Sequence, residues 1–89
     1  MSYYGRRFIF CDNVEYRRGI IEVTPNIHEG CINLETWRVS VEWPGTSAAE
    51  WMEDEKEALT SHSTEIELSI EQAKELIAEL QEAIEKSKS

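Results

Sequence analysis

The C-terminal segment 69–86 carries the pattern that most limits how this chain folds. Its apolar residues recur at helical spacing, at Ile70, Ala73, Leu76, Ile77, Leu80, Ala83 and Ile84. Ser69, with Gln72 three positions further on, forms a capping box that marks where the helix begins. At 1.5 Å per residue, segment 70–86 makes a helix about 25 Å long. A helix with one apolar face needs an apolar surface to pack on, and we expect a β-sheet to supply it.

The first part of the chain is predicted to form a β-hairpin. Segments 4–11 and 14–24 are rich in aromatic and β-branched residues, which favour strands. Asp12-Asn13 between them predicts a tight turn, because both residue types tolerate a left-handed backbone. Gly19, in the middle of the second segment, indicates a bulge or a close approach of another backbone.

Segment 31–43 shows the clearest strand alternation in the chain. Trp37, Val39, Val41 and Trp43 share one parity, whereas Ile32 and Leu34 share the other. A side chain changes face at every residue of a strand, so we expect a bulge near Glu35-Thr36 to reconcile the two halves. Pro44-Gly45 then ends the strand.

The remaining segment, 46–69, is predicted to hold a short helix and a last strand. Ser47 and Glu50 form a second capping box, which favours a helix within 46–60; a long acidic loop is the alternative. Residues 61–64 are predicted as a linker and 65–69 as a strand. The order β-β-β-α-β-α describes one α+β domain, residues 1–89. We expect a small antiparallel sheet of three to four strands with the long C-terminal helix packed on one face. Its radius of gyration would be roughly 12 Å.

The charge of the chain limits which partners it can bind. Nine basic residues face eighteen acidic ones, for a net charge of −9. Wrapping duplex nucleic acid or lying on an anionic membrane needs a basic surface, so we expect neither. Residues 1–45 hold five arginines and six acidic residues, whereas residues 46–89 hold four lysines and twelve acidic residues. An excess of −8 in the helical half predicts attraction to a basic protein surface.

Two acidic clusters are the predicted partner-binding residues. The first lies on the helix face opposite the apolar stripe, at Glu71, Glu75, Glu79 and Glu82, and the second comprises Glu53, Asp54, Glu55 and Glu57, with Trp51 as an apolar anchor. Such carboxylates would engage lysines and arginines that normally hold phosphates. The plainer interpretation is a solvated helix face, with Trp51 in the core.

A non-enzymatic acidic inhibitor that occupies the nucleic-acid-binding surface of another protein is the first functional hypothesis. Small acidic phage proteins that block CRISPR effectors or restriction enzymes are of this general kind, a comparison based on size and charge. One alternative is a homodimeric regulatory or assembly subunit that acts through its sheet face or edge. A second alternative is a binder of single-stranded RNA or DNA, with a sheet surface of Arg6, Arg17, Arg18, Arg38 and Tyr16.

The sequence contains no motif that indicates catalysis, a cofactor or a metal. His28 and Cys31 form one H-x-x-C pair, whereas a zinc site needs three or four ligands. No glycine-rich phosphate loop or nucleophile elbow is present. Cys11 and Cys31 are expected to be free thiols, because nothing in the sequence resembles a secretion signal or a membrane span; a disulfide between them is the alternative. We therefore expect a cytoplasmic protein that is not an enzyme.

Overall fold

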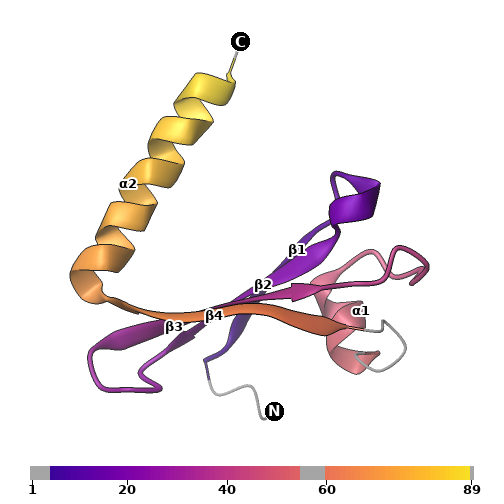
Figure 1. The fold of residues 1–89 in the computed structure, drawn as a ribbon, viewed down its shortest axis with the longest axis horizontal. Coiled ribbons are helices and arrows are strands. Elements are labelled where there is room, and N and C mark those ends of the chain that lie inside the picture. The colour runs from indigo at the N-terminus through magenta and orange to yellow at the C-terminus, as the bar shows by residue number, and fades with distance from the viewer. Residues whose placement is uncertain (1–4, 55–59, 89) are drawn as a thin grey trace.

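The protein folds as an antiparallel sheet with two α-helices in a computed structural model that describes residues 5–54 and 60–88 (Figure 1). Its elements are β1 (Arg7–Cys11), the short 3-10 helix η1 (Glu15–Arg17), β2 (Gly19–Pro25), β3 (Cys31–Arg38), α1 (Ala48–Glu53), β4 (Ser61–Ser69) and α2 (Ile70–Ser87). The predicted α+β class and the β-β-β-α-β-α order are confirmed. All four strands join one sheet in the order β1-β2-β3-β4, each antiparallel to its neighbour.

The strand register divides the sheet into two chemically different faces. Phe8 lies opposite Glu22, which lies opposite Glu35, and these side chains share the near face, which packs against α1. Ile9 lies opposite Ile21 on the other side, which we call the far face. The predicted bulge is confirmed: the register between β3 and β4 shifts between Thr36 and Trp37.

The core lies between the near face and α1. It is formed by the buried residues Ile20, Val39, Trp43 and Trp51. The Phe8 ring packs on the Trp51 ring with centroids 5.3 Å apart, and Phe10 meets Trp43 edge-on at 5.8 Å. A few large aromatic rings therefore do most of the packing, as expected for a chain with so little interior.

The first hairpin differs from the prediction. The predicted pairing of the two strands as a hairpin is confirmed, but the tight turn of two or three residues is wrong. The connection contains a 3-10 turn, in which the backbone N–H of Arg17 donates to the Val14 carbonyl at 2.8 Å. Gly19 therefore begins β2 instead of standing in its middle. The expected close approach is present, because a Cβ at Gly19 would lie 2.6 Å from the Trp37 carbonyl oxygen.

The third strand ends earlier than its alternation predicts. β3 stops at Arg38, and residues 39–47 form an irregular loop. The guanidinium of Arg18 explains the difference, since it donates to four carbonyls of this loop, at Ser40, Val41, Trp43 and Gly45 (2.7–3.4 Å). Those carbonyls are thereby satisfied without a neighbouring strand.

The last strand and the short helix also have different limits. α1 spans only Ala48–Glu53, and residues 55–59 of the predicted helix lie outside the described residues. The predicted linker 61–64 is wrong, because β4 begins at Ser61 and pairs along the whole length of β3. Its polar composition fits an edge strand, which has one partner and is largely exposed.

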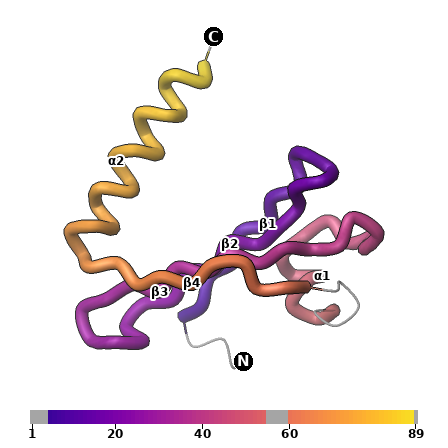
Figure 2. The backbone as a smooth tube through the Cα atoms, in the orientation of Figure 1, coloured from indigo at the N-terminus to yellow at the C-terminus, as the bar shows by residue number. Residues whose placement is uncertain are grey.

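The long helix forms where predicted but does not pack on its own sheet. Figure 2 shows α2 leaving the end of β4 and standing away from the strands. None of its residues is buried, and only Ala73 is as much as half-buried. The radius of gyration, 14.3 Å, accordingly exceeds the roughly 12 Å of a compact chain of this length. The expected helix-on-sheet packing is absent because β4 passes directly into α2, with no loop that would let the helix fold back.

Candidate interaction surfaces

The carboxylates of α2 form an exposed row on one side of the helix. Glu71, Glu75, Glu79 and Glu82 are all exposed, as predicted for a solvent-facing row. Lys74 lies 3.8 Å from Glu71, and Lys86 lies 3.1 Å from Glu82, both as pairs along the helix. Such exposed pairs stabilise a helix by only a few tenths of a kcal/mol. The row therefore keeps a net negative charge that faces solvent.

The opposite side of α2 is an apolar stripe that is equally open. The exposed fractions are 53% for Ile70, 37% for Leu76, 55% for Ile77, 54% for Leu80 and 55% for Ile84. Apolar side chains at these positions gain free energy only when another surface covers them. The helix thus presents two chemically opposite faces, and neither contacts the core.

The second predicted acidic cluster lies at the end of α1. Glu53 and Asp54 are exposed there, whereas Glu55 and Glu57 lie outside the described residues. Trp51, proposed as an exposed anchor, is fully buried, and its indole N–H donates to the Thr60 hydroxyl at 2.7 Å. The anchor prediction is wrong, because this large ring fills the space between Phe8 and Trp37.

Two arginines of the predicted sheet surface have structural partners. Arg6 donates two hydrogen bonds to the Glu22 carboxylate, at 2.5 and 3.1 Å, and Arg18 binds the loop carbonyls described above. Burial alone would raise the pKa of Glu22, but hydrogen bonds from Arg6, Trp37 and Thr24 outweigh it and lower that pKa. Both arginines are therefore engaged within the fold.

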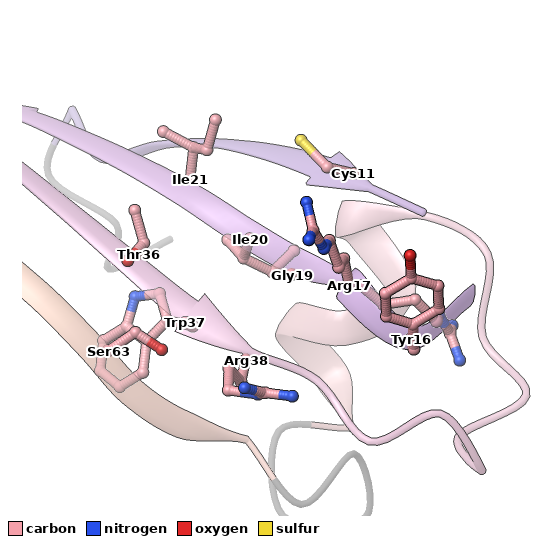
Figure 3. A pocket seen from close by; sticks show the side chains of 11 residues that line it. Cys11, Tyr16, Arg17, Gly19, Ile20, Ile21, Thr36, Trp37, Arg38 and Ser63 are labelled. Carbon is pink, nitrogen blue, oxygen red and sulfur yellow. The ribbon is translucent and has the colours of Figure 1, made fainter. Parts of the chain in front are cut away.

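The other residues of that surface gather around a pocket at one end of the sheet. Figure 3 shows Tyr16 and Arg17 from η1 beside the start of β2, with Arg38 at the end of β3. The pocket holds about 350 Å³ and is also lined by Cys11, Ile21, Thr36 and Ser63. Arg17 lies 5.5 Å from the centre of the Tyr16 ring, and Arg17 and Arg38 are both exposed. The structure thus places Tyr16, Arg17 and Arg38 around one pocket, with Tyr16 and Arg17 on η1 and not on a strand.

The histidines and cysteines do not come together. His28 contacts Glu67 at 2.6 Å, and Cys11 and Cys31 are free, half-buried thiols. Among the described residues, three side chains that could bind a metal lie together: the ligand atoms of Glu35, His62 and Glu65 are all within 4.8 Å of one another. His62 Nε2 already contacts Glu35 at 2.8 Å and its ring packs on Trp37 at 4.5 Å, so contacts within the sheet account for this cluster.

Comparisons with known proteins identify no relative of this chain. It matches no family model, no curated protein and no solved structure. In the part of the chain that the structure describes, neither helix is long and apolar enough to cross a membrane. Functional inference therefore depends on the surfaces themselves.

Proposed function

We propose that this chain is a non-enzymatic binding protein that acts through α2 and docks on a basic surface of a partner protein. The observation that carries the proposal is that α2, a helix of 18 residues, has no buried residue. Helices in proteins gain most of their stability from packing an amphipathic face. A helix that packs on nothing in its own chain is suited to contact another molecule.

The charge of α2 supports the choice of a basic partner. α2, which carries the carboxylate row, stands away from the sheet (Figure 1), and the five arginines of the chain all lie in its first half. A surface of one sign steers an oppositely charged partner and raises its rate of association. Protein surfaces that hold nucleic acid are of this basic kind, so an inhibitor of a nuclease or of a CRISPR effector fits the proposal.

A charge-reversal series tests the proposal. Photo-crosslinking from position 75 of α2 in native cells identifies the partner, and the dissociation constant is then measured at two salt concentrations. Reversal of Glu75 and Glu82 to lysine, directly opposite the apolar stripe, is expected to weaken binding at least about tenfold, because like charges would then face each other.

The matched control reverses two exposed acidic residues elsewhere, Glu29 and Glu42, which changes the net charge equally. Binding of this control is expected to stay within about twofold of the original value, because charges away from the contact act only through screened, long-range fields. Binding that ignores both salt and the α2 reversals would contradict an electrostatic role for the helix.

A further inference from the structure

The far face of the sheet is a second uncovered apolar surface of this chain. Seven aliphatic residues from all four strands form it: Ile9, Ile21, Val23, Ile32, Leu34, Ile66 and Leu68. None of them is buried, and Ile9 and Ile66 are 56% and 48% exposed. On the near face, by contrast, Ile20 is 1% exposed. The near face is covered by α1, but no described element of the chain forms a layer over this apolar far face.

The uncovered far face and the apolar stripe of α2 are suited to cover each other. The stripe of α2 consists of the same kind of aliphatic side chains as the far face, and a helix laid on a sheet is how α+β domains bury both. Large exposed apolar patches on a folded chain commonly mark contact sites. Two complementary patches of this kind on one chain indicate that they meet each other.

The helix does not lie on the far face of its own sheet. β4 ends at Ser69, and α2 begins at the next residue, Ile70. When a helix packs on the sheet that holds the preceding strand, a loop of about 2–6 residues normally connects the two. No such loop separates β4 from α2. Figure 1 shows the result, since α2 rises steeply from the end of the sheet. With this junction kept as it is, a surface that covers the stripe would come from another chain.

We propose that two copies of this chain form a symmetric dimer by exchanging α2. The apolar stripe of each helix lies on the far face of the partner copy's sheet. The arrangement is self-complementary, as a twofold interface requires, because each copy offers one stripe and one face. Exchange of an element that lacks a connecting loop is a common route to such dimers.

The charges on the two surfaces favour this pairing. Arg7, Arg17 and Arg38 are exposed arginines of the far-face side, the last two at the pocket of Figure 3. The exchanged helix belongs to the half of the chain that carries −8. Glu79 borders the stripe, next to Leu76 and Ala83 around the helix, where it can approach these cations. The carboxylates at Glu75 and Glu82 point the other way and stay open.

The contact area reaches the lower limit expected of a specific dimer interface. A helix of 18 residues is about 27 Å long, and its contact strip is about 10 Å wide. Two such contacts, counted over both chains, cover about 1,100 Å², which exceeds the roughly 1,000 Å² expected of a specific interface. Each contact is almost wholly apolar at its centre, as in interfaces of permanent dimers.

Sedimentation velocity of the full chain at micromolar concentration tests the dimer. The expected mass is twice the 10.3 kDa of the chain. Ile77→Lys in the stripe and Ile66→Lys on the far face are each expected to weaken the dimer at least about a hundredfold, because each places an unpaired charge in the contact. Glu82→Lys, on the outer side of the same helix, is expected to leave the dimer intact. A monomeric parent chain, or a dimer that survives both isoleucine changes, would overturn the proposal.

Cysteine crosslinking tests the exchange of α2 directly. Unlike the lysine variants, it does not require a substitution that could weaken the dimer by destabilising the fold. In a background of Cys11→Ser and Cys31→Ser, chains with Ile66→Cys are mixed with chains with Leu80→Cys and oxidised. The expected product is a disulfide between the two kinds of chain, with at least about tenfold less product when Glu82→Cys replaces Leu80→Cys. Preferential joining of Leu80→Cys chains to one another would indicate helix-on-helix pairing and would refute the exchange.

Discussion

Ser69 and Gln72 exchange hydrogen bonds at the junction of β4 and α2. The Gln72 backbone N–H donates to the Ser69 hydroxyl at 3.1 Å, and the Ser69 backbone N–H donates to the Gln72 side-chain oxygen at 2.9 Å. Ser69 also pairs with Cys31 as the last residue of β4. One residue thus ends the strand and caps the helix, which fixes the direction in which α2 leaves the sheet.

We predict that Ser69→Ala loosens α2 without unfolding the sheet. Loss of an N-cap hydroxyl costs about 1 kcal/mol, and α2 has no core contacts that would compensate for it. Hydrogen exchange of the first-turn amides of α2 is expected to speed up about fivefold. Ser61→Ala, at the exposed start of β4, is the control and should leave exchange in α2 unchanged. Equal exchange rates in the two variants would contradict the capping role.

We predict that Trp51→Ala unfolds much of the domain. The Trp51 side chain is 0% exposed and joins Phe8 and Trp37 in the small core. Truncation of a buried tryptophan costs about 3–5 kcal/mol, a large part of the total stability of a domain this size. Urea unfolding followed by far-UV circular dichroism measures the loss. Val41→Ala, at a position 51% exposed, should shift the midpoint little, and a similar midpoint for both variants would argue against a core role for Trp51.

We predict that Arg17 and Arg18 behave very differently despite being neighbours. Arg18→Ala leaves the carbonyls of the 39–47 loop without their charged donor, and each such bond is worth about 1.5–3 kcal/mol. Arg17→Ala removes only an exposed stacking contact with Tyr16. Urea titrations should show a clear loss of stability for Arg18→Ala and almost none for Arg17→Ala. Arg18→Lys should restore only part of the loss, because one ammonium nitrogen cannot replace both Nη1, which donates to Trp43, and Nη2, which donates to Gly45.

Elements with local signals could be predicted from the sequence. The capping box at Ser69 and Gln72 and the spacing of apolar residues located α2 correctly, because both patterns act within one or two turns. Parity arguments likewise placed the bulge near Thr36. These features depend on residues that are close together in the chain.

Features that depend on distant residues could not be predicted. The strand expected to reach Trp43 stops at Arg38 because Arg18, 20 residues earlier, binds the loop that follows. The burial of Trp51 depends on Phe8 and Trp37 from two different strands. For α2 the amphipathic pattern predicted an apolar contact, but a pattern within one helix does not say which surface covers it. Of the predicted sheet surface, Tyr16, Arg17 and Arg38 are exposed to solvent. Arg6 and Arg18 instead bind groups within the fold.

We predict that Glu22 makes the stability of the fold depend on acid. Glu22 is 2% exposed and accepts hydrogen bonds from Arg6 and from the Trp37 indole N–H at 3.0 Å. These bonds favour the charged carboxylate, so the pKa of Glu22 lies below the 4.5 of an ordinary glutamate. A group with a lowered pKa in the folded state stabilises the fold above its unfolded pKa. That stabilisation is lost as the pH falls through the folded pKa, because protonation breaks the pair with Arg6.

The free energy of unfolding, measured in urea from pH 7 down to about pH 2, checks this prediction for Glu22→Gln. At pH 7 the variant should be less stable by about 2 kcal/mol, because Arg6 keeps its charge without a carboxylate beside it. Below pH 4.5 the parent protein should begin to approach the variant, because Glu22 of the unfolded chain binds a proton there, and the two should converge once the pH falls below the lowered folded pKa. Glu29→Gln, on an exposed loop, is the control and should follow the parent at every pH. If the free energies of unfolding of Glu22→Gln and the parent differ by the same amount at every pH, Glu22 does not change its charge on folding within this range. That result would refute its role in the acid dependence.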